Sequence, residues 1–120
     1  MEVRKLAAAF VAAWATSQAG AASFDCTKAG TRVERMICAD ISLSRLDDAM
    51  SQTYGQMRVA QSADAGASAW LKTTQREWLK QRNACDAPAC VRAAYLSRID
   101  EVCGMPVASG THPGCPEVTP

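Results

Sequence analysis

The sequence predicts a small all-α protein, a disulfide-stapled bundle of one short and three longer helices with an irregular C-terminal tail. Alternating runs of β-branched residues are missing, whereas good helix formers such as Ala, Leu, Met, Gln and Arg dominate. Apolar residues recur at helical spacing, and six cysteines follow the first 25 residues. A chain of this length buries only a small core, so we expect covalent staples to stabilise it.

The first 22 residues have the composition of a secretory signal peptide. Two basic residues precede an apolar run over residues 6–14, and small residues follow at positions 19–22. The apolar run is shorter than the roughly 20 residues that span a bilayer, which disfavours a retained anchor helix. We therefore expect cleavage before Ala22 or Ser23, export to the periplasm or the exterior, and no stable membrane anchor afterwards. Disulfides form in such an oxidising compartment.

The remaining chain divides into a helical domain, residues 23–103, and a tail, residues 104–120. Without residues 1–22 the numbers of basic and acidic residues are equal. No basic surplus favours nucleic acid or an anionic membrane as a partner. We expect a protein partner instead, and the composition leaves the oligomeric state open.

Capping signals and periodicity predict the first two helices. Thr31 and Glu34 have the spacing of a capping box, so a short helix should begin there and run to about Cys38. Asp40 should cap a longer helix that ends near Val59. The apolar residues of this second helix share one stripe: Leu43, Leu46, Met50, Tyr54 and Met57.

Two further helices and the tail follow. The small, polar segment 61–68 predicts a loop or a frayed helix end, and a third helix should run from about Ser68 to Cys85. Pro88 suits the first turn of a fourth helix that ends near Cys103. The tail is rich in Pro and Gly, which predicts irregular structure. The expected core consists of Leu43, Leu46, Met50, Tyr54, Trp78, Val91, Tyr95 and Ile99.

The six cysteines allow many pairings, but local geometry favours sequence neighbours. The helical corner suits Cys85–Cys90, the first helix suits Cys26–Cys38, and the tail suits Cys103–Cys115. In the chain-entropy model the two longer loops contribute about 3 kcal/mol each and the short loop about 2 kcal/mol. A zinc or redox site is the rival interpretation. The missing C-x-x-C spacing and the single histidine disfavour it, so we expect no metal.

Three polar side chains, Gln75, Arg82 and Arg98, lie within the apolar stripes of the last two helices. Their burial is unfavourable unless each finds partners. We expect a partly buried structural network with Asp47 and Glu34 as acceptors, in which Arg82 or Arg98 makes a bidentate bond to Asp47. A substrate-binding arginine is the functional alternative.

Several segments occur together in a characteristic order. They are Phe24-Asp25-Cys26, Thr31-x-Val33-Glu34-x-x-Ile37-Cys38-Ala39-Asp40, Leu43-Ser44-x-Leu46-Asp47, Gln75-Arg76-x-Trp78-Leu79-x-x-Arg82-x-x-Cys85, and later Cys90, Tyr95 and Arg98-Ile99. Over residues 24–102 this pattern resembles the N-terminal domain family named after the lysozyme inhibitor LprI, which comprises small exported bacterial proteins. The resemblance implies the fold, export and an inhibitory activity. The chain departs from it at Ile41, at Asn83 and in its third cysteine pair, Cys103 and Cys115.

Three places could contact a partner. The turn with Asp86, Ala87 and Pro88 is closed by two cysteines and thus already ordered, but it offers few donors to the two carboxylates of a muramidase cleft. A plain staple of the helical hairpin is therefore the favoured interpretation of this turn. Trp70 lies about 100° around its helix from the core face and could anchor a partner. His112 in the tail could donate to an acidic cleft.

No catalytic constellation is visible in the sequence. The single histidine lies in the tail, and adjacent carboxylates such as Asp47 and Asp48 point about 100° apart on a helix. We expect no enzyme activity and no cofactor. The hypothesis is an exported binding protein that inhibits a lysozyme-type muramidase by non-covalent occlusion. The alternative is an envelope accessory or protein-interaction module with another partner and no catalytic activity.

Overall fold

The all-α prediction is confirmed by the computed structural model, which describes residues 22–108 and 110–118. These residues form no strand. Their elements are a short 3-10 turn, η1 (Cys26–Lys28), and four α-helices: α1 (Arg32–Ala39), α2 (Ile41–Ala60), α3 (Ala65–Asn83) and α4 (Pro88–Cys103).

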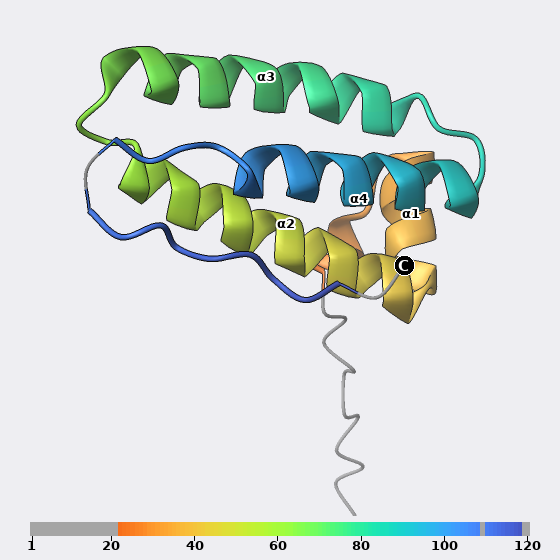
Figure 1. Cartoon of the computed structure of the whole chain (residues 1–120). Helices are drawn as coiled ribbons and strands as arrows, with labels where there is room; N and C mark the ends of the chain where they lie inside the picture. The colour runs from red at the N-terminus through yellow and green to blue at the C-terminus, as the bar shows by residue number, and fades with distance from the viewer. Residues whose placement is uncertain (1–21, 109, 119–120) are drawn as a thin grey trace, which may run out of the picture.

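Helix α4 is the centre of the bundle. It lies between α2 and α3, while α1 packs against one end and the tail returns along α2 (Figure 1). Because α4 contacts all three other helices, its inward side chains are almost fully enclosed, including Val91, Tyr95 and Val102. The arrangement explains why α2 and α3 need only one apolar stripe each.

Helix starts follow the predicted caps, with one correction. Thr31 and Glu34 form the complete capping box of α1, and Asp40 accepts the first amides of α2. Helix α3 begins at Ala65 and not near Ser68, so the predicted loop or frayed end was wrong for residues 65–67. The reason is a third cap that the sequence analysis passed over. Asp64 Oδ1 accepts a hydrogen bond of 2.9 Å from the amide of Ala67.

The core contains the predicted residues and a contribution from α1. Val33 and Ile37 of α1 are fully buried, and this packing explains why so short a helix is stable. Tyr54 lies at the edge of the core and is only partly buried. The remaining buried hydrophobic residues are Leu43, Leu46, Met50, Met57, Leu71, Trp78, Cys85, Val91, Tyr95, Ile99, Val102 and Cys103.

The three predicted disulfides are present. Cys26–Cys38 ties the N-terminal arm to the end of α1, Cys85–Cys90 closes the corner between α3 and α4, and Cys103–Cys115 holds the tail. Their Cα atoms lie 5.8, 5.6 and 5.5 Å apart, within the usual range for disulfides.

The tail is held by more than its disulfide. Buried Gln61 donates a hydrogen bond of 2.8 Å to the carbonyl of Pro106, and Met105 and Val107 pack on the core. No helix in the described part of the chain has the length and apolarity needed to cross a membrane.

Candidate functional site

Asp47 is a buried carboxylate that connects three helices with the N-terminal arm. Its Oδ1 accepts a hydrogen bond of 2.6 Å from the Tyr95 hydroxyl. Its Oδ2 accepts two bonds of 2.6 Å, one from the backbone nitrogen and one from the hydroxyl of Ser23. Asp47 is only 5% exposed and Tyr95 is fully buried, so the bond between these two side chains lies in a poorly solvated environment.

Arg82 reaches Asp47 chiefly through Tyr95. Its Nη1 donates to the Tyr95 hydroxyl at 2.9 Å and lies 3.7 Å from Asp47 Oδ1. The predicted bidentate contact was therefore wrong, because the phenol occupies the space between the two charges. The other guanidinium nitrogens donate to Asn83 Oδ1 at 3.1 and 2.8 Å.

The aromatic residues complete this cluster. The rings of Trp78 and Tyr95 meet edge to face with centroids 5.1 Å apart, and Arg82 lies over both rings. Trp78 Nε1 donates to the carbonyl of Ala94 at 3.0 Å. Among the described residues, no buried side-chain nitrogen or oxygen lacks a hydrogen-bond partner. Each buried polar atom of the network thus has at least one partner within the protein, so its geometry favours a structural role.

Arg98 belongs to a separate cluster and does not meet Asp47. Its guanidinium donates to Gln75 at 3.0 Å, to Thr74 at 2.9 Å and to Glu101 at 2.8 Å. It also lies over the ring of Trp70, with 5.8 Å to the centroid. The sequence analysis missed Thr74 and Glu101, although Glu101 follows Arg98 by three residues, a spacing that brings helical side chains together.

Glu34 takes no part in either cluster. It accepts from the amide of Thr31 at 3.3 Å as the second half of the capping box. The prediction that Glu34 would accept from a buried arginine was therefore wrong. The reason is that the otherwise unpaired amide of Thr31 at the start of α1 lies within reach of the Glu34 carboxylate. The second position beside Asp47 is occupied by Ser23.

Burial raises the pKa of Tyr95 well above its ordinary value, and the adjacent Asp47 carboxylate raises it further. The unfolded chain releases this proton near pH 10, before the folded chain does. We expect the contribution of the protonated Tyr95 hydroxyl to the free energy of unfolding to be complete below about pH 10. It should decline as the pH rises through the pKa of Tyr95 in the folded protein. Urea unfolding at pH 8 to 11 measures the decline. Tyr95→Phe should show a smaller loss over this range, and an equal loss in both proteins would contradict the assignment to Tyr95.

The predicted contact residues do not form one surface. Asp86 makes an exposed ion pair with Arg32 of α1, and Pro88 is the first residue of α4. Trp70 is 42% exposed and lies in the N-terminal half of α3, whereas the turn follows the C-terminal end of that helix. His112 accepts from the amide of Gly114 within the tail loop.

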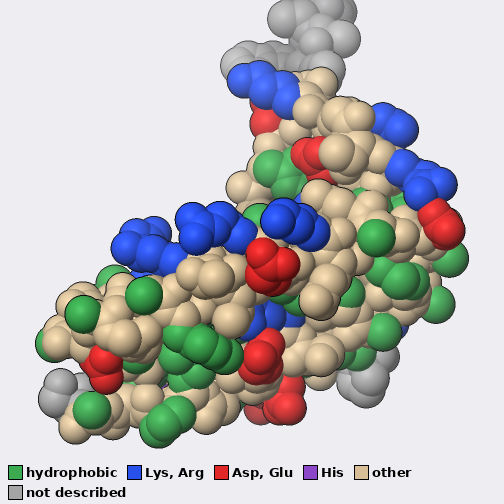
Figure 2. All heavy atoms as spheres, turned by 90° about the horizontal axis from the view of Figure 1, so that it is seen from above, with side chains coloured by type: hydrophobic (Ala, Val, Ile, Leu, Met, Phe, Trp, Pro, Cys, Tyr) green, Lys and Arg blue, Asp and Glu red, His purple; other side chains and the backbone are tan. Residues whose placement is uncertain are grey.

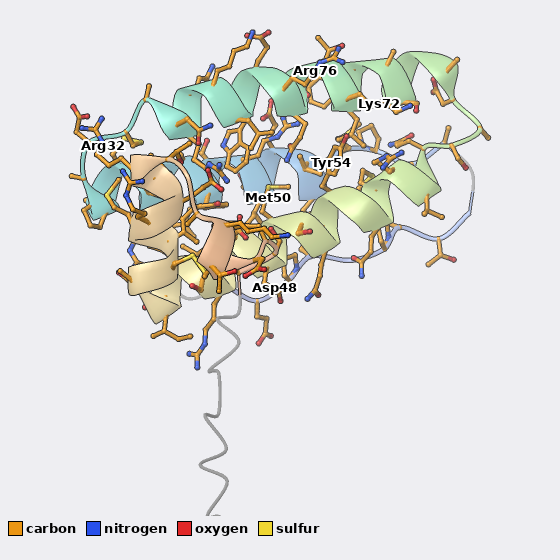
Figure 3. The ribbon with its side chains drawn as sticks, turned by 180° about the vertical axis from the view of Figure 1, so that it is seen from behind. Arg32, Asp48, Met50, Tyr54, Lys72 and Arg76 are labelled. Carbon is orange, nitrogen blue, oxygen red and sulfur yellow. A yellow bond between two sulfur atoms is a disulfide. The ribbon has the colours of Figure 1, made fainter. Side chains whose placement is uncertain are left out.

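A basic surface that follows α3 and reaches the C-terminal end of α2 was not predicted. We define the α2–α3 basic face by four exposed side chains: Arg58, Lys72, Arg76 and Lys80. Figure 2 shows Lys and Arg side chains in a row on the upper side of the molecule. Lys72 and Arg76 on α3 lie on the same side as Tyr54 on α2 (Figure 3).

The helical spacing accounts for this face. Lys72, Arg76 and Lys80 follow each other every four residues, which aligns them along one flank of α3. Arg58 lies over the ring of Tyr54 and lines an open hollow together with Lys72. Lys80 pairs with Glu77, whereas the other three cations make no ion pair within the described residues. The four-residue spacing of the α3 cations can be seen in the sequence. Their position beside Arg58 of α2 depends on the fold.

The comparisons with known proteins identify the family. The family described as "Lysozyme inhibitor LprI" matches residues 25–104. The chain belongs to the LprI family. Proteins named "Lipoprotein LprI" from Mycobacterium bovis and Mycobacterium tuberculosis are 33% identical over 102 residues, which cover 82% of this chain and 49% of theirs. The chain thus spans about half the length of these curated relatives, and no solved structure matches.

The segment that matches the LprI family contains most of the buried polar residues and two of the disulfides. It includes Asp47, Arg82 and Tyr95 and the disulfides Cys26–Cys38 and Cys85–Cys90, whereas Ser23 and Cys115 lie outside it. The described residues contain no group of three or more His, Cys, Asp or Glu side chains that could hold a metal ion. All six cysteines are paired.

Proposed function

We propose that this protein is exported and inhibits a lysozyme-type muramidase by occluding its cleft without covalent chemistry. The observation that carries the proposal is the LprI family match over residues 25–104. Disulfides hold the N-terminal arm, the α3–α4 corner and the tail, so little conformational entropy would be lost on binding. We also propose that the protein is not itself an enzyme and takes no cofactor.

The proposed contact surface is the α2–α3 basic face. A muramidase cleft holds two carboxyl groups and attracts hydrogen-bond donors of positive charge. Lys72, Arg76 and Arg58 supply such donors. The turn at Asp86 does not, because its side chain is acidic and paired with Arg32.

We further propose that export leaves the protein without a lipid anchor, in the periplasm or outside the cell. The relatives are named lipoproteins, yet Asp25 precedes the first cysteine of this chain, and the sulfur of that cysteine is bonded to Cys38. Partitioning of the exported protein into aqueous or detergent phase tests this point.

The decisive assay adds purified, oxidised protein to lysis reactions with several lysozyme types. A dose-dependent fall in the lysis rate supports inhibition. Flat rates at high micromolar protein contradict it for those types and favour the alternative, an envelope module with another protein partner. Release of sugar or peptide from peptidoglycan by this protein alone would contradict a non-catalytic role.

Charge reversal tests the contact surface. Lys72→Glu with Arg76→Glu should raise the inhibition constant about tenfold or more, because two attractive contacts become repulsive. The matched control is Lys28→Glu with Arg45→Glu, which changes the net charge equally at exposed positions outside the basic face. Inhibition constants from the lysis assay, measured at two salt concentrations, provide the readout.

A third variant distinguishes the opposite flank of α3. Trp70→Ala removes the exposed ring over Arg98 and leaves the four basic side chains in place. If this variant loses inhibition while the charge-reversed protein retains it, the contact surface lies on the Trp70 side. Equal effects of the charge-reversed and control pairs would likewise contradict the basic face.

A further inference from the structure

Ser23 is bound to the folded domain by its backbone nitrogen. This nitrogen and the Ser23 hydroxyl each lie 2.6 Å from Oδ2 of Asp47. Asp47 is 5% exposed, yet Ser23 itself lies at the surface. A backbone nitrogen beside a buried carboxylate becomes a much stronger donor if the chain begins at that residue, because it is then an ammonium with three hydrogens.

We propose that a leader peptidase cleaves the Ala22–Ser23 bond and that the new α-ammonium of Ser23 forms an ion pair with Asp47. Water adds across the peptide bond, so that Ala22 leaves as a carboxylate and Ser23 keeps the amine, which is protonated at neutral pH. The small residues Gly20 and Ala22 fit a leader-peptidase site. The inference rests on the proposed export.

The two oxygens of Asp47 are divided between two positive groups in this arrangement. Oδ1 faces Arg82 through the Tyr95 hydroxyl, and Oδ2 faces Ser23. Cleavage one residue earlier would leave an uncharged amide at Ser23 and move the ammonium about 3.8 Å along the chain. Only the product that begins at Ser23 therefore places the new charge directly on the buried carboxylate.

Processing would then complete the network that joins α2, α3 and α4. The leader and the ammonium cannot be present together, so the chain gains this ion pair only when the leader is removed. Folding would thereby be favoured after export, in the compartment where the three disulfides also form.

N-terminal sequencing and intact mass of protein exported from the full chain test the cleavage. A chain that begins at Ser23 supports the inference. A chain that begins at Ala22 overturns it and leaves the proposed inhibition untouched. An unprocessed chain retained in the cytosol contradicts both this inference and export, whereas a Ser23 chain without effect on lysis contradicts inhibition alone.

The reactivity of the α-amine tests the ion pair. An amine-reactive acyl reagent at neutral pH should modify the native α-amine at least about tenfold more slowly than the denatured one, with disulfides intact. Ser23→Ala keeps the nitrogen and should keep most of the protection, whereas Asp47→Asn should lose it. If Asp47→Asn does not fold, the comparison of native and denatured wild-type protein decides. Equal rates in those two states overturn the ion pair.

Discussion

Replacing Asp47 with alanine is expected to lower the free energy of unfolding by about 3 to 4 kcal/mol. The change removes the acceptor of the Tyr95 hydroxyl and of both Ser23 donors. It also leaves the buried Arg82 guanidinium without its counter-charge, and an uncompensated buried charge is the largest part of the loss. Urea or guanidinium unfolding followed by tryptophan fluorescence measures the effect.

Asp48→Ala is the matched control, since it removes the same group from the next residue of α2. Asp48 accepts one exposed hydrogen bond from Gln52, so its loss should change stability by less than about 0.5 kcal/mol. Arg82→Ala should again cost about 3 kcal/mol, because it removes the other charge of the same pair. Similar midpoints for Asp47→Ala and Asp48→Ala would refute the structural role assigned to the network.

The sequence predicts the fold well because local signals and the hydrophobic pattern agree. Thr31 with Glu34, Asp40 and Pro88 each mark the start of a helix, and the structure confirms all three. The start of α3 was misplaced because Ala65 and Gly66 resemble a loop in composition. The cap at Asp64 determines the helix start there.

The polar contacts were harder to predict because they depend on distances across the bundle. The position of Arg82 within an apolar stripe, with Asp47 as an acceptor, predicted a network, but not that the Tyr95 hydroxyl would lie between the two charges. Ser23 carried no signal at all, since its contact joins residues 24 positions apart through an irregular arm. The α2–α3 basic face was missed because Arg58 and Lys72 line the same hollow only after the chain has turned back between α2 and α3.

Removing the Cys26–Cys38 disulfide by a double change to serine is expected to cost about 3 kcal/mol from chain entropy alone. We expect an additional loss, because this disulfide fixes the arm that carries Ser23 against Asp47. The Cys103–Cys115 pair is the matched control. Both pairs have a sequence separation of 12 residues, so the chain-entropy contribution is the same.

A comparison of the two double variants therefore separates two contributions of the Cys26–Cys38 disulfide to stability: the chain entropy of loop closure and the anchoring of the arm. Unfolding midpoints should fall further for Cys26→Ser with Cys38→Ser than for the change at Cys103 and Cys115. Combination with Asp47→Ala should be less than additive only for the first pair, because release of the arm has already removed two of the bonds to Asp47. Strict additivity for both pairs would mean that the arm and the carboxylate are energetically independent, despite the 2.6 Å contacts between them.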